Sequence, residues 1–382
     1  MPKKFRRRKH RTVRDVLEDL GMSVEEIDSA EANGTDELLA LDSLVVPERD
    51  KLTIEELSDK VEIEVAVIRA FWRALGFVEP PDGDPGFGRR DVTIMKALAE
   101  LTREGLIEPA LGLQVTRVIG VSMAQVAAAV IDAGSVRSDE LREAADDVGG
   151  DADESGESDG VDESIAVRAA ELVPFLGDVL DYALRRHLRA AARRRVAVVS
   201  ATDDAAQVVG FADIVRFAEL SAQVDDRGLA QVLLRFDALV NEAVVQRGGR
   251  IVKMIGDAAM FTLVDPVDGA LLALDLSKLV AADDLLTGIR LGMASGPVLS
   301  RDGDLYGPIV NTASRLVEIG RTGAVNVTEE IRDALAGDER FALRSLGVRN
   351  LRHIGATRVY RLRPGPAWSP TGEVDGGGTV DV

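Results

Sequence analysis

Cysteine is absent from this 382-residue chain, histidine occurs only three times, and aromatic residues are few. Without cysteine the protein can form neither disulfide bonds nor thiolate metal sites, which is compatible with a reducing compartment. No apolar run approaches the length needed to span a bilayer, and the N-terminus lacks the apolar core of a signal peptide. The sequence therefore predicts a soluble, cytoplasmic protein without a transmembrane segment.

The chain is strongly acidic, with a formal net charge of -19. This charge argues against nucleic acid as a partner and suits a protein that binds an anionic ligand through metal ions and a few cations. Residues 3–11 are densely basic, and we interpret them as a solubilising tail rather than a contact with an anionic surface. Residues 138–164 contain twelve Asp and Glu with few apolar side chains, which predicts a disordered linker.

Residues 13–134 have mostly helical periodicity. Within them, residues 53–77 begin with a capping box of Thr53 and Glu56 and resemble the helix-turn-helix of MerR-like regulators. Glu62 stands in the turn, where those regulators have glycine, and acidic side chains surround it. Carboxylates repel phosphate, so we expect a packing module rather than a DNA reader. A transcription regulator or scaffold acting through this half is the alternative, and it would need a basic recognition helix.

A long helix is predicted over residues 165–195, with an interruption near Pro174 and Gly177 left open. It has an apolar face and ends in a cluster of arginines around His187. Histidine titrates between about pH 5 and 8, so His187 is a candidate regulatory residue, and clustered carboxylates are an equal candidate.

From Gln207 onward, patterns typical of strands alternate with patterns typical of helices. Strands are predicted at 208–214, 288–294, 298–300, 324–327, 341–346 and 358–362, and helices at 225–246, 266–280 and 308–319. Apolar residues on both sides of Gly256 and Asp257 predict a hairpin with a tight turn. This order indicates an α+β sheet covered by helices. Residues after Pro364 are expected to be disordered.

Polar residues in four short segments stand out against this apolar background. They are Asp213; Lys253 with Asp257; Asp304; and Asn311 with Arg315. In order and spacing the set resembles the signature of class III nucleotide cyclases, and all six positions carry the residue expected of an adenylate cyclase. The resemblance covers about Gln207 to Leu362 and implies a ferredoxin-like catalytic domain that converts ATP to cyclic AMP and pyrophosphate.

The resemblance implies two divalent metal ions, Mg²⁺ or Mn²⁺, held by Asp213, Asp257 and the Ile214 carbonyl. Hard cations prefer oxygen ligands, and they would activate the 3′-hydroxyl and hold the triphosphate. Asn311 and Arg315 are four apart on a predicted helix and share a face. The resemblance assigns Asn311 to the ribose oxygen and Arg315 to the charge that grows on the α-phosphate.

Lys253 and Asp304 indicate which base the site would bind. Adenine offers an acceptor at N1 and a donor at N6, which match a lysine donor and an aspartate acceptor. Guanine offers the opposite pattern, and mismatched buried polar groups are costly. The sequence therefore predicts ATP rather than GTP as the substrate, with guanylate cyclase as the rival enzyme.

In the resembled family the site forms between two catalytic domains. A chain with one such domain that carries all six residues implies a head-to-tail homodimer with two sites. Two positions need comment. Arg216 precedes Phe217 where the family usually has glycine, so the loop expected to bring the Phe217 amide to the phosphates departs from the family pattern. Arg352 lies where the family often has a basic residue for the terminal phosphates. A cyclase-like scaffold of low activity is the other alternative.

The front half and the linker helix resemble the regulatory portion of bacterial adenylate cyclases that are inhibited at neutral pH and activated by acid. We therefore predict a helical regulatory domain over 1–137, a linker over 138–164, a linker helix over 165–195, a catalytic domain over 196–364 and a tail over 365–382. A lipid or small apolar ligand is an alternative signal to protons.

Overall fold

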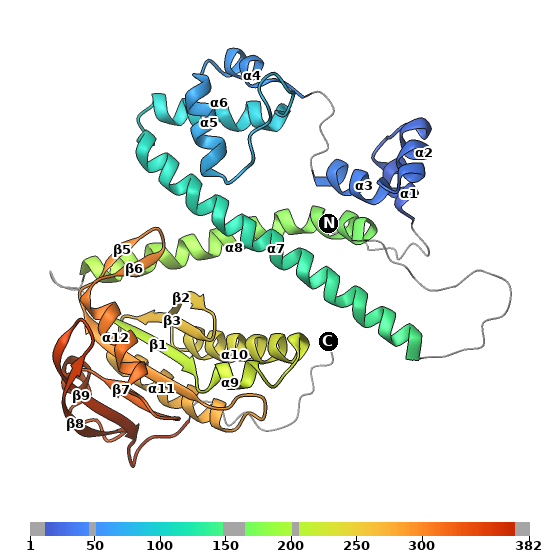
Figure 1. The fold of residues 1–382 in the computed structure, drawn as a ribbon. Coiled ribbons are helices and arrows are strands. Elements are labelled where there is room, and N and C mark those ends of the chain that lie inside the picture. The colour runs from blue at the N-terminus through green and yellow to red at the C-terminus, as the bar shows by residue number, and fades with distance from the viewer. Residues whose placement is uncertain (1–11, 46–50, 148–164, 201–205, 371–382) are drawn as a thin grey trace. The chain divides into compact units, whose positions relative to one another are not determined.

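The computed structural model describes residues 12–45, 51–147, 165–200 and 206–370 (Figure 1). The chain divides into two compact units, residues 1–191 and 192–382. The basic segment 3–11, most of the acidic linker and the end of the tail lie outside the described residues, so the predictions for them stay predictions.

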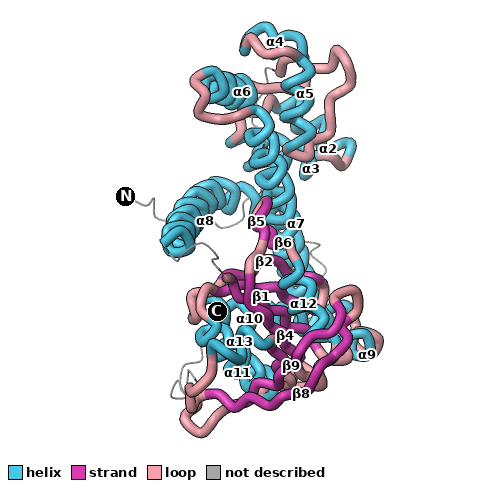
Figure 2. The backbone as a smooth tube through the Cα atoms, turned by 90° about the vertical axis from the view of Figure 1, so that its left-hand side faces the viewer, coloured by secondary structure: helices cyan, strands magenta, loops and turns pink. Residues whose placement is uncertain are grey.

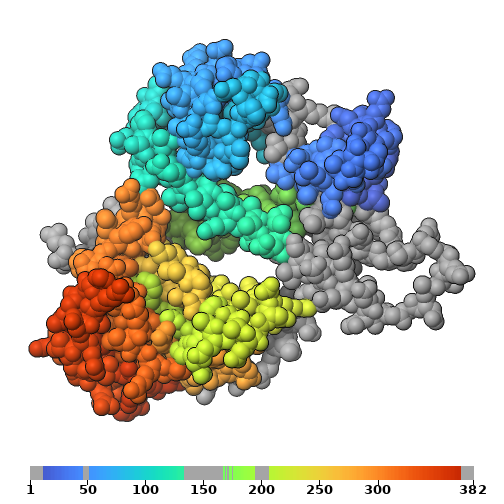
Figure 3. All heavy atoms as spheres, in the orientation of Figure 1, coloured from blue at the N-terminus to red at the C-terminus, as the bar shows by residue number. Residues whose placement is uncertain are grey.

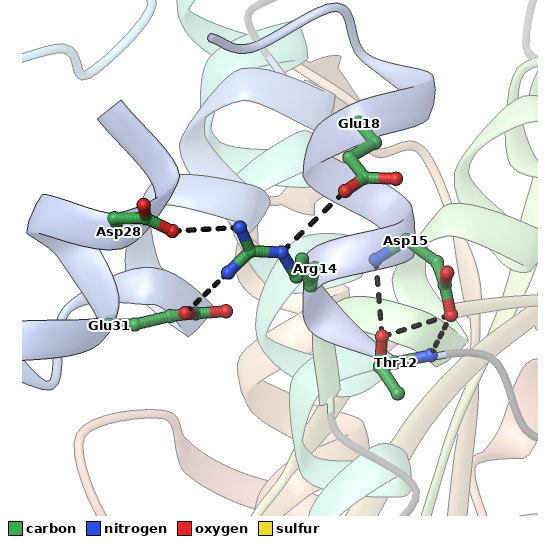
Figure 4. Close-up of polar contacts among 6 residues, drawn as sticks. All are labelled: Thr12, Arg14, Asp15, Glu18, Asp28 and Glu31. Carbon is green, nitrogen blue, oxygen red and sulfur yellow. Dashed lines mark hydrogen bonds and ion pairs between the residues drawn. The ribbon is translucent and has the colours of Figure 1, made fainter. Parts of the chain in front are cut away.

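The first unit begins with three short helices. These are α1 (Val13–Asp19), α2 (Val24–Asn33) and α3 (Asp36–Val45). Capping boxes begin α1 and α2, where Thr12 and Ser23 each exchange hydrogen bonds with an acidic residue three positions later. Arg14 of α1 donates to Asp28 and Glu31 of α2 at 2.7 Å each, which joins the two helices at the surface (Figure 4).

The next helices are α4 (Ile54–Val61), α5 (Val65–Ala74) and α6 (Arg89–Arg103). The predicted capping box is confirmed, because the Glu56 carboxylate accepts from the Thr53 N–H at 2.9 Å. Glu62 lies between α4 and α5 with φ of 56°, so it adopts the left-handed conformation that glycine takes with less backbone strain. The tight turn therefore forms although the glycine is missing.

Two long helices follow, α7 (Pro109–Asp147) and α8 (Ile165–Ser200). α7 continues into the acidic stretch expected to be a linker. α8 is continuous through Pro174 and Gly177 and ends five residues beyond Arg195. Contrary to expectation, the segment Pro109–Asp132 of α7 has the length and mean hydropathy, 1.4, of a membrane span. Helices of soluble proteins also meet these criteria, so length and hydropathy alone do not assign a membrane span here.

The second unit is built on a seven-stranded sheet in the order β2-β3-β1-β4-β7-β9-β8. The strands are β1 (Gln207–Ile214), β2 (Arg250–Ile255), β3 (Ala258–Leu263), β4 (Ile289–Gly296), β7 (Val325–Val327), β8 (Phe341–Leu351) and β9 (Gly355–Pro364). β1 lies between β3 and β4 and is antiparallel to both. Helix Asp226–Gln246 connects β1 to β2, and helix Pro266–Ala281 connects β3 to β4. This arrangement confirms the expected ferredoxin-like α+β fold.

Helices cover both faces of the sheet (Figures 1 and 2). The helices are α9 (Phe217–Ser221), α10 (Asp226–Gln246), α11 (Pro266–Ala281), α12 (Pro308–Glu318) and α13 (Glu329–Ala334). α10 and α11 pack on one face, where Phe236, Phe261 and Leu272 are fully buried. α12 packs on the other through Ala313 and Val317. We call these the α10–α11 face and the α12 face. A small ribbon, β5 (Leu299–Arg301) with β6 (Asp304–Tyr306), precedes α12.

The prediction that disorder begins after Pro364 is wrong for the first residues of the tail. The Gly365 N–H donates to the Arg340 carbonyl at 2.8 Å, and the Trp368 ring packs against the core of the α10–α11 face. The Lys278 ammonium lies 5.9 Å from the centre of that ring. These contacts hold residues 365–368 against the domain.

Candidate active site

Asp213 and Asp257 come together where β1 ends beside the β2–β3 turn. In the register of the sheet Asp213 lies opposite Ala258, the residue after Asp257. The Ile214 N–H donates to the Asp257 carbonyl at 3.1 Å, which fixes the turn against the end of β1. Gly256 has φ of 60°, which a tight hairpin turn requires. Two carboxylates and the backbone of Ile214 therefore lie together at one end of the central strands.

Arg290 of β4 is directly opposite Asp213, and its Nη2 donates to Asp213 Oδ2 at 2.8 Å. The second oxygen, Oδ1, is buried without a hydrogen-bond partner among the described residues. Burial raises the pKa of the Asp213 carboxyl above its usual value; Arg290 opposes this rise and Asp257 adds to it. The site therefore holds more negative charge than Arg290 alone balances.

These observations fit a cation. A buried carboxylate oxygen without a partner and a second carboxylate nearby form a hard oxygen donor set, which divalent cations prefer. Within the described ranges no group of three or more His, Cys, Asp or Glu side chains could hold a metal. Any cation bound here would therefore need further oxygen ligands from the backbone or from a bound anion.

The sequence analysis missed Arg290. A signal was present, because Arg290 is the only charged residue in the strand Ile289–Gly296. A charge inside a buried strand needs a partner of opposite charge. The partner could not be identified from the sequence, because it depends on the pairing register of two strands far apart in the chain.

Lys253 and Asp304 form an ion pair of 2.5 Å between Nζ and Oδ2. The β2–β3 ladder slips between Ile251 and Lys253, so Lys253 lies opposite Met260 while Ile251 lies opposite Phe261. This bulge turns both Val252 and Lys253 towards the α12 face. Burial tends to raise the pKa of Asp304, but hydrogen bonds from Lys253 and from the Leu305 N–H hold it below its usual value.

α12 carries Asn311 and Arg315 one turn apart, as the sequence predicted. Pro308 is the first residue of the helix, and Gly307 before it has φ of 134°. Asn311 is exposed, and the Arg315 guanidinium donates to the Glu318 carboxylate. Ala313 and Val317 are buried on the opposite side of the helix, which directs the two polar residues away from the sheet.

The remaining predicted residues lie outside these contacts, and most of them are exposed. Phe217 begins α9 and packs against the core of the α10–α11 face. Arg216 before it is exposed and has φ of 59°, so arginine adopts here a conformation that glycine prefers. Arg352 is exposed and its Nε contacts His353 Nε2 at 3.1 Å. His187 is exposed on α8.

The structure thus brings together two pairs of predicted residues. Asp213 and Asp257 act on each other at the end of β1, and Lys253 and Asp304 form an ion pair, while Asn311 and Arg315 lie on α12. Among the described residues no hydrogen bond or ion pair joins one pair to the other. Lys253 and Asp257 nevertheless lie on one hairpin, near its middle and at its tip.

Comparison with known proteins gives consistent matches. Residues 199–363 match the family model described as adenylate and guanylate cyclase catalytic domain. An adenylate cyclase of Glutamicibacter nicotianae is 28% identical over 86% of this chain and 83% of its own. One of Streptomyces coelicolor is 30% identical over 88% of this chain and 92% of its own.

Two further matches cover less of the chain. The pH-sensitive adenylate cyclase MT1302 of Mycobacterium tuberculosis is 34% identical over 53% of this chain and 54% of its own. Among solved structures, the adenylyl cyclase CyaB from P. aeruginosa is 20% identical, with a TM-score of 0.39 over 43% of this chain and 97% of that one.

The match to the Streptomyces relative extends over nearly the whole of both chains and includes the helical front half. The family model covers the sheet that carries Asp213, Asp257 and Lys253. The chain therefore belongs to the class III adenylate cyclases, with a helical half in front of the catalytic domain.

Proposed function

We propose that this enzyme converts ATP to 3′,5′-cyclic AMP and pyrophosphate at two equivalent sites, each formed between the catalytic domains of two copies. The observation that supports the proposal is that the Asp213–Asp257 pair and the Lys253–Asp304 pair are separate on one chain, with no hydrogen bond or ion pair between them among the described residues. Each pair alone lacks part of the chemistry. A head-to-tail pair of chains would unite the carboxylates of one copy with the polar residues of the other.

Asp213, Asp257 and the Ile214 carbonyl would hold two divalent cations, Mg²⁺ or Mn²⁺, which supply Lewis-acid stabilisation of the triphosphate and lower the pKa of the 3′-hydroxyl. The unpartnered Asp213 Oδ1 supports this assignment. The Phe217 amide and Arg352 are proposed to contact the phosphates, and Arg290 keeps a positive charge beside Asp213.

The other copy would bind and orient the nucleoside. Lys253 donates to adenine N1 and Asp304 accepts from N6; their ion pair sets these two groups side by side. Asn311 would hold the ribose so that the 3′-oxygen faces the α-phosphorus. The 3′-hydroxyl loses its proton to solvent, the new bond joins its oxygen to the α-phosphorus, the bond from the α-phosphorus to the bridging oxygen of the β-phosphate breaks, and pyrophosphate leaves with the electron pair.

Arg315 is proposed to balance the charge that develops on the α-phosphate during this step. A donor of this kind is worth about a hundredfold in rate or more. In the described structure its guanidinium is engaged by Glu318, so nucleotide binding would have to compete with that carboxylate.

A complementation experiment tests the shared site. Asp257→Ala and Arg315→Ala chains are each expected to be inactive. In a mixed dimer one site receives both defects and the other receives neither. Equal mixing should therefore restore about a quarter of the wild-type activity, since half the dimers are mixed and each has one intact site. Activity that stays at the level of the single variants would contradict the shared site.

We also propose that the helical front half regulates the catalytic domain through pH. A relative named as pH-sensitive is 34% identical over about half of this chain, which supports the proposal. Cyclic AMP production by the full chain should rise in acid between about pH 8 and 5, while a chain that begins at Val196 should respond weakly. If the full chain stays silent at every pH and the shorter one is active, the regulator answers to another signal.

A further inference from the structure

Four arginines gather on the α12 face at the β9–β8 end of the sheet. Arg344 of β8 lies directly opposite Arg361 of β9, and Arg363 follows two residues along the same strand. Residues two apart on a strand point to the same face, so three guanidinium groups share it. Arg321, in the turn after α12, lies close enough to act on Arg361 electrostatically. We call these four residues the arginine cluster.

A buried amide orients one member of the cluster. Arg361 is half-buried, and its Nε donates to Asn326 Oδ1 at 2.9 Å. Asn326 is 0% exposed, and its Nδ2 donates to the Leu316 carbonyl at 2.8 Å. Both ends of the amide are thus used, which fixes Arg361 against the strand. The remaining N–H groups of Arg361 have no partner in the part of the chain that the structure describes.

The cluster carries positive charge that the described residues do not balance. None of the four arginines forms an ion pair with a described carboxylate, although the chain has 65 Asp and Glu against 46 Lys and Arg. Burial lowers the pKa of Arg361, and Arg363, Arg321 and Arg344 lower it further. Like charges directly opposite on neighbouring strands destabilise a sheet. Without a bound anion, repulsion among the four arginines therefore lowers the stability of the folded domain.

We propose that the arginine cluster is an anion-binding site, separate from the catalytic residues, that takes a polyphosphate group. Guanidinium groups present paired N–H donors that match phosphate oxygens. Four unpaired positive charges around one oriented guanidinium suit an anion with several charges better than a single carboxylate. Pyrophosphate and the triphosphate of a nucleotide share this chemistry.

The hairpin that carries three of the arginines is open to such a ligand. β8 is the last strand of the sheet, and the atoms of β8 and β9 lie at the surface (Figure 3). Arg321, Arg344 and Arg363 are exposed. Arg352, assigned above to the terminal phosphates of the substrate, lies between β8 and β9 at the opposite end of the hairpin. The two sets of arginines are thus separated along the strands.

Titration calorimetry with pyrophosphate tests the proposal. The parent is the full wild-type chain kept in a chelator, so that metal-dependent binding at the catalytic residues does not contribute and Arg290 stays paired with Asp213. In this background Arg344→Gln and Arg361→Gln should each weaken pyrophosphate binding about tenfold or more, the value of a charge-assisted hydrogen bond. Titration with ATP and cyclic AMP compares a triphosphate with a single phosphate, which should bind far more weakly.

The control is Arg349→Gln, which removes one positive charge from the same hairpin. Arg349 is exposed and lies opposite Thr357, so no second arginine faces it. Its variant should bind pyrophosphate within about twofold of the parent. Thermal unfolding checks the fold, and Arg344→Gln should raise the midpoint in the absence of ligand because it removes a like-charge pair. If Arg361→Gln fails to fold, Arg344→Gln with Arg363→Gln replaces it.

Three results would overturn the proposal. The first is no measurable binding of pyrophosphate or ATP to the parent. The second is an equal loss of binding in Arg349→Gln and Arg344→Gln, which would indicate unspecific attraction. The third is binding of duplex DNA or of vesicles containing phosphatidylglycerol that depends on Arg344 while pyrophosphate does not bind. The assay needs no turnover, so its outcome is independent of whether the proposed reaction is correct.

Discussion

The Asp213 carboxylate accepts a hydrogen bond of 2.8 Å from Arg290, the residue directly opposite it on the neighbouring strand. Both side chains are less than a third exposed. The pair therefore places one fixed positive charge beside two carboxylates at the point where cations are proposed to bind.

Replacement of Arg290 by methionine should expose this dependence. The half-buried Asp213 would lose its counter-ion, which should reduce the free energy of unfolding by about 1–3 kcal/mol at neutral pH. Added Mn²⁺ should then raise the melting temperature of Arg290→Met more than that of the wild type, because the cation replaces the missing charge. Arg301→Met, on an exposed arginine, is the control. Equal stabilisation of all three proteins by Mn²⁺ would count against a cation site at Asp213.

Asp213→Asn should separate stability from activity. The folded-state pKa of Asp213 lies above its usual value, chiefly through burial, so protonation favours the folded state. The charged carboxylate therefore lowers the free energy of unfolding at every pH above the folded-state pKa. This destabilisation is lost as the pH falls through the folded-state pKa towards the pKa of the unfolded chain. Without metal, Asp213→Asn should unfold at higher urea concentration than wild type at pH 7, with the difference shrinking near about pH 4. Cyclic AMP production should fall about a hundredfold or more.

Asp304→Asn tests the choice of base. An asparagine amide can donate as well as accept, so it can face guanine O6, whereas the aspartate repels it. We expect the preference for ATP over GTP, as the ratio of kcat/KM values, to fall about tenfold or more. Lys253 would also lose its ion-pair partner, so Asp304→Ala serves as the control for that loss. A variant that keeps the full preference for ATP would show that the base is read elsewhere.

Substitution of Arg216 should have little effect on the KM for ATP. Its side chain is exposed and has no ion pair among the described residues, so we expect Arg216→Ala to change the KM for ATP by no more than about twofold. Arg216→Gly should raise the free energy of unfolding by about 0.5–1 kcal/mol relative to Arg216→Ala, because only glycine adopts positive φ without strain. A tenfold or larger fall in KM for both variants would mean that the arginine crowds the triphosphate.

The sequence predicted those parts of the fold that depend on local pattern. The Gly256–Asp257 turn, the helix with Asn311 and Arg315, and the cap at Thr53 each follow from neighbouring residues. The short helices α9 and α13 were missed, since five or six residues give too little periodicity to recognise. The order of Trp368 depends on a distant core that the tail itself does not specify.

The same distinction between local pattern and distant contact applies to the site residues. The identity and order of Asp213, Asp257, Lys253 and Asp304 could be read from the chain, whereas the partner of Asp213 could not. The contact of Arg290 with Asp213 depends on strand register over 77 positions of sequence. The arginine cluster likewise needs strands paired before Arg344 and Arg361 become neighbours.

The extra residue in β2 has a consequence for how substrate choice could change. In a regular strand Lys253 would share the face of Ile251 and would enter the apolar layer beneath α10 and α11. Only the irregular backbone at Val252 brings the ammonium round to Asp304. Straightening this strand, by a change that touches no polar side chain, would therefore withdraw the lysine from Asp304 and from the proposed adenine site, and should weaken the proposed preference for ATP.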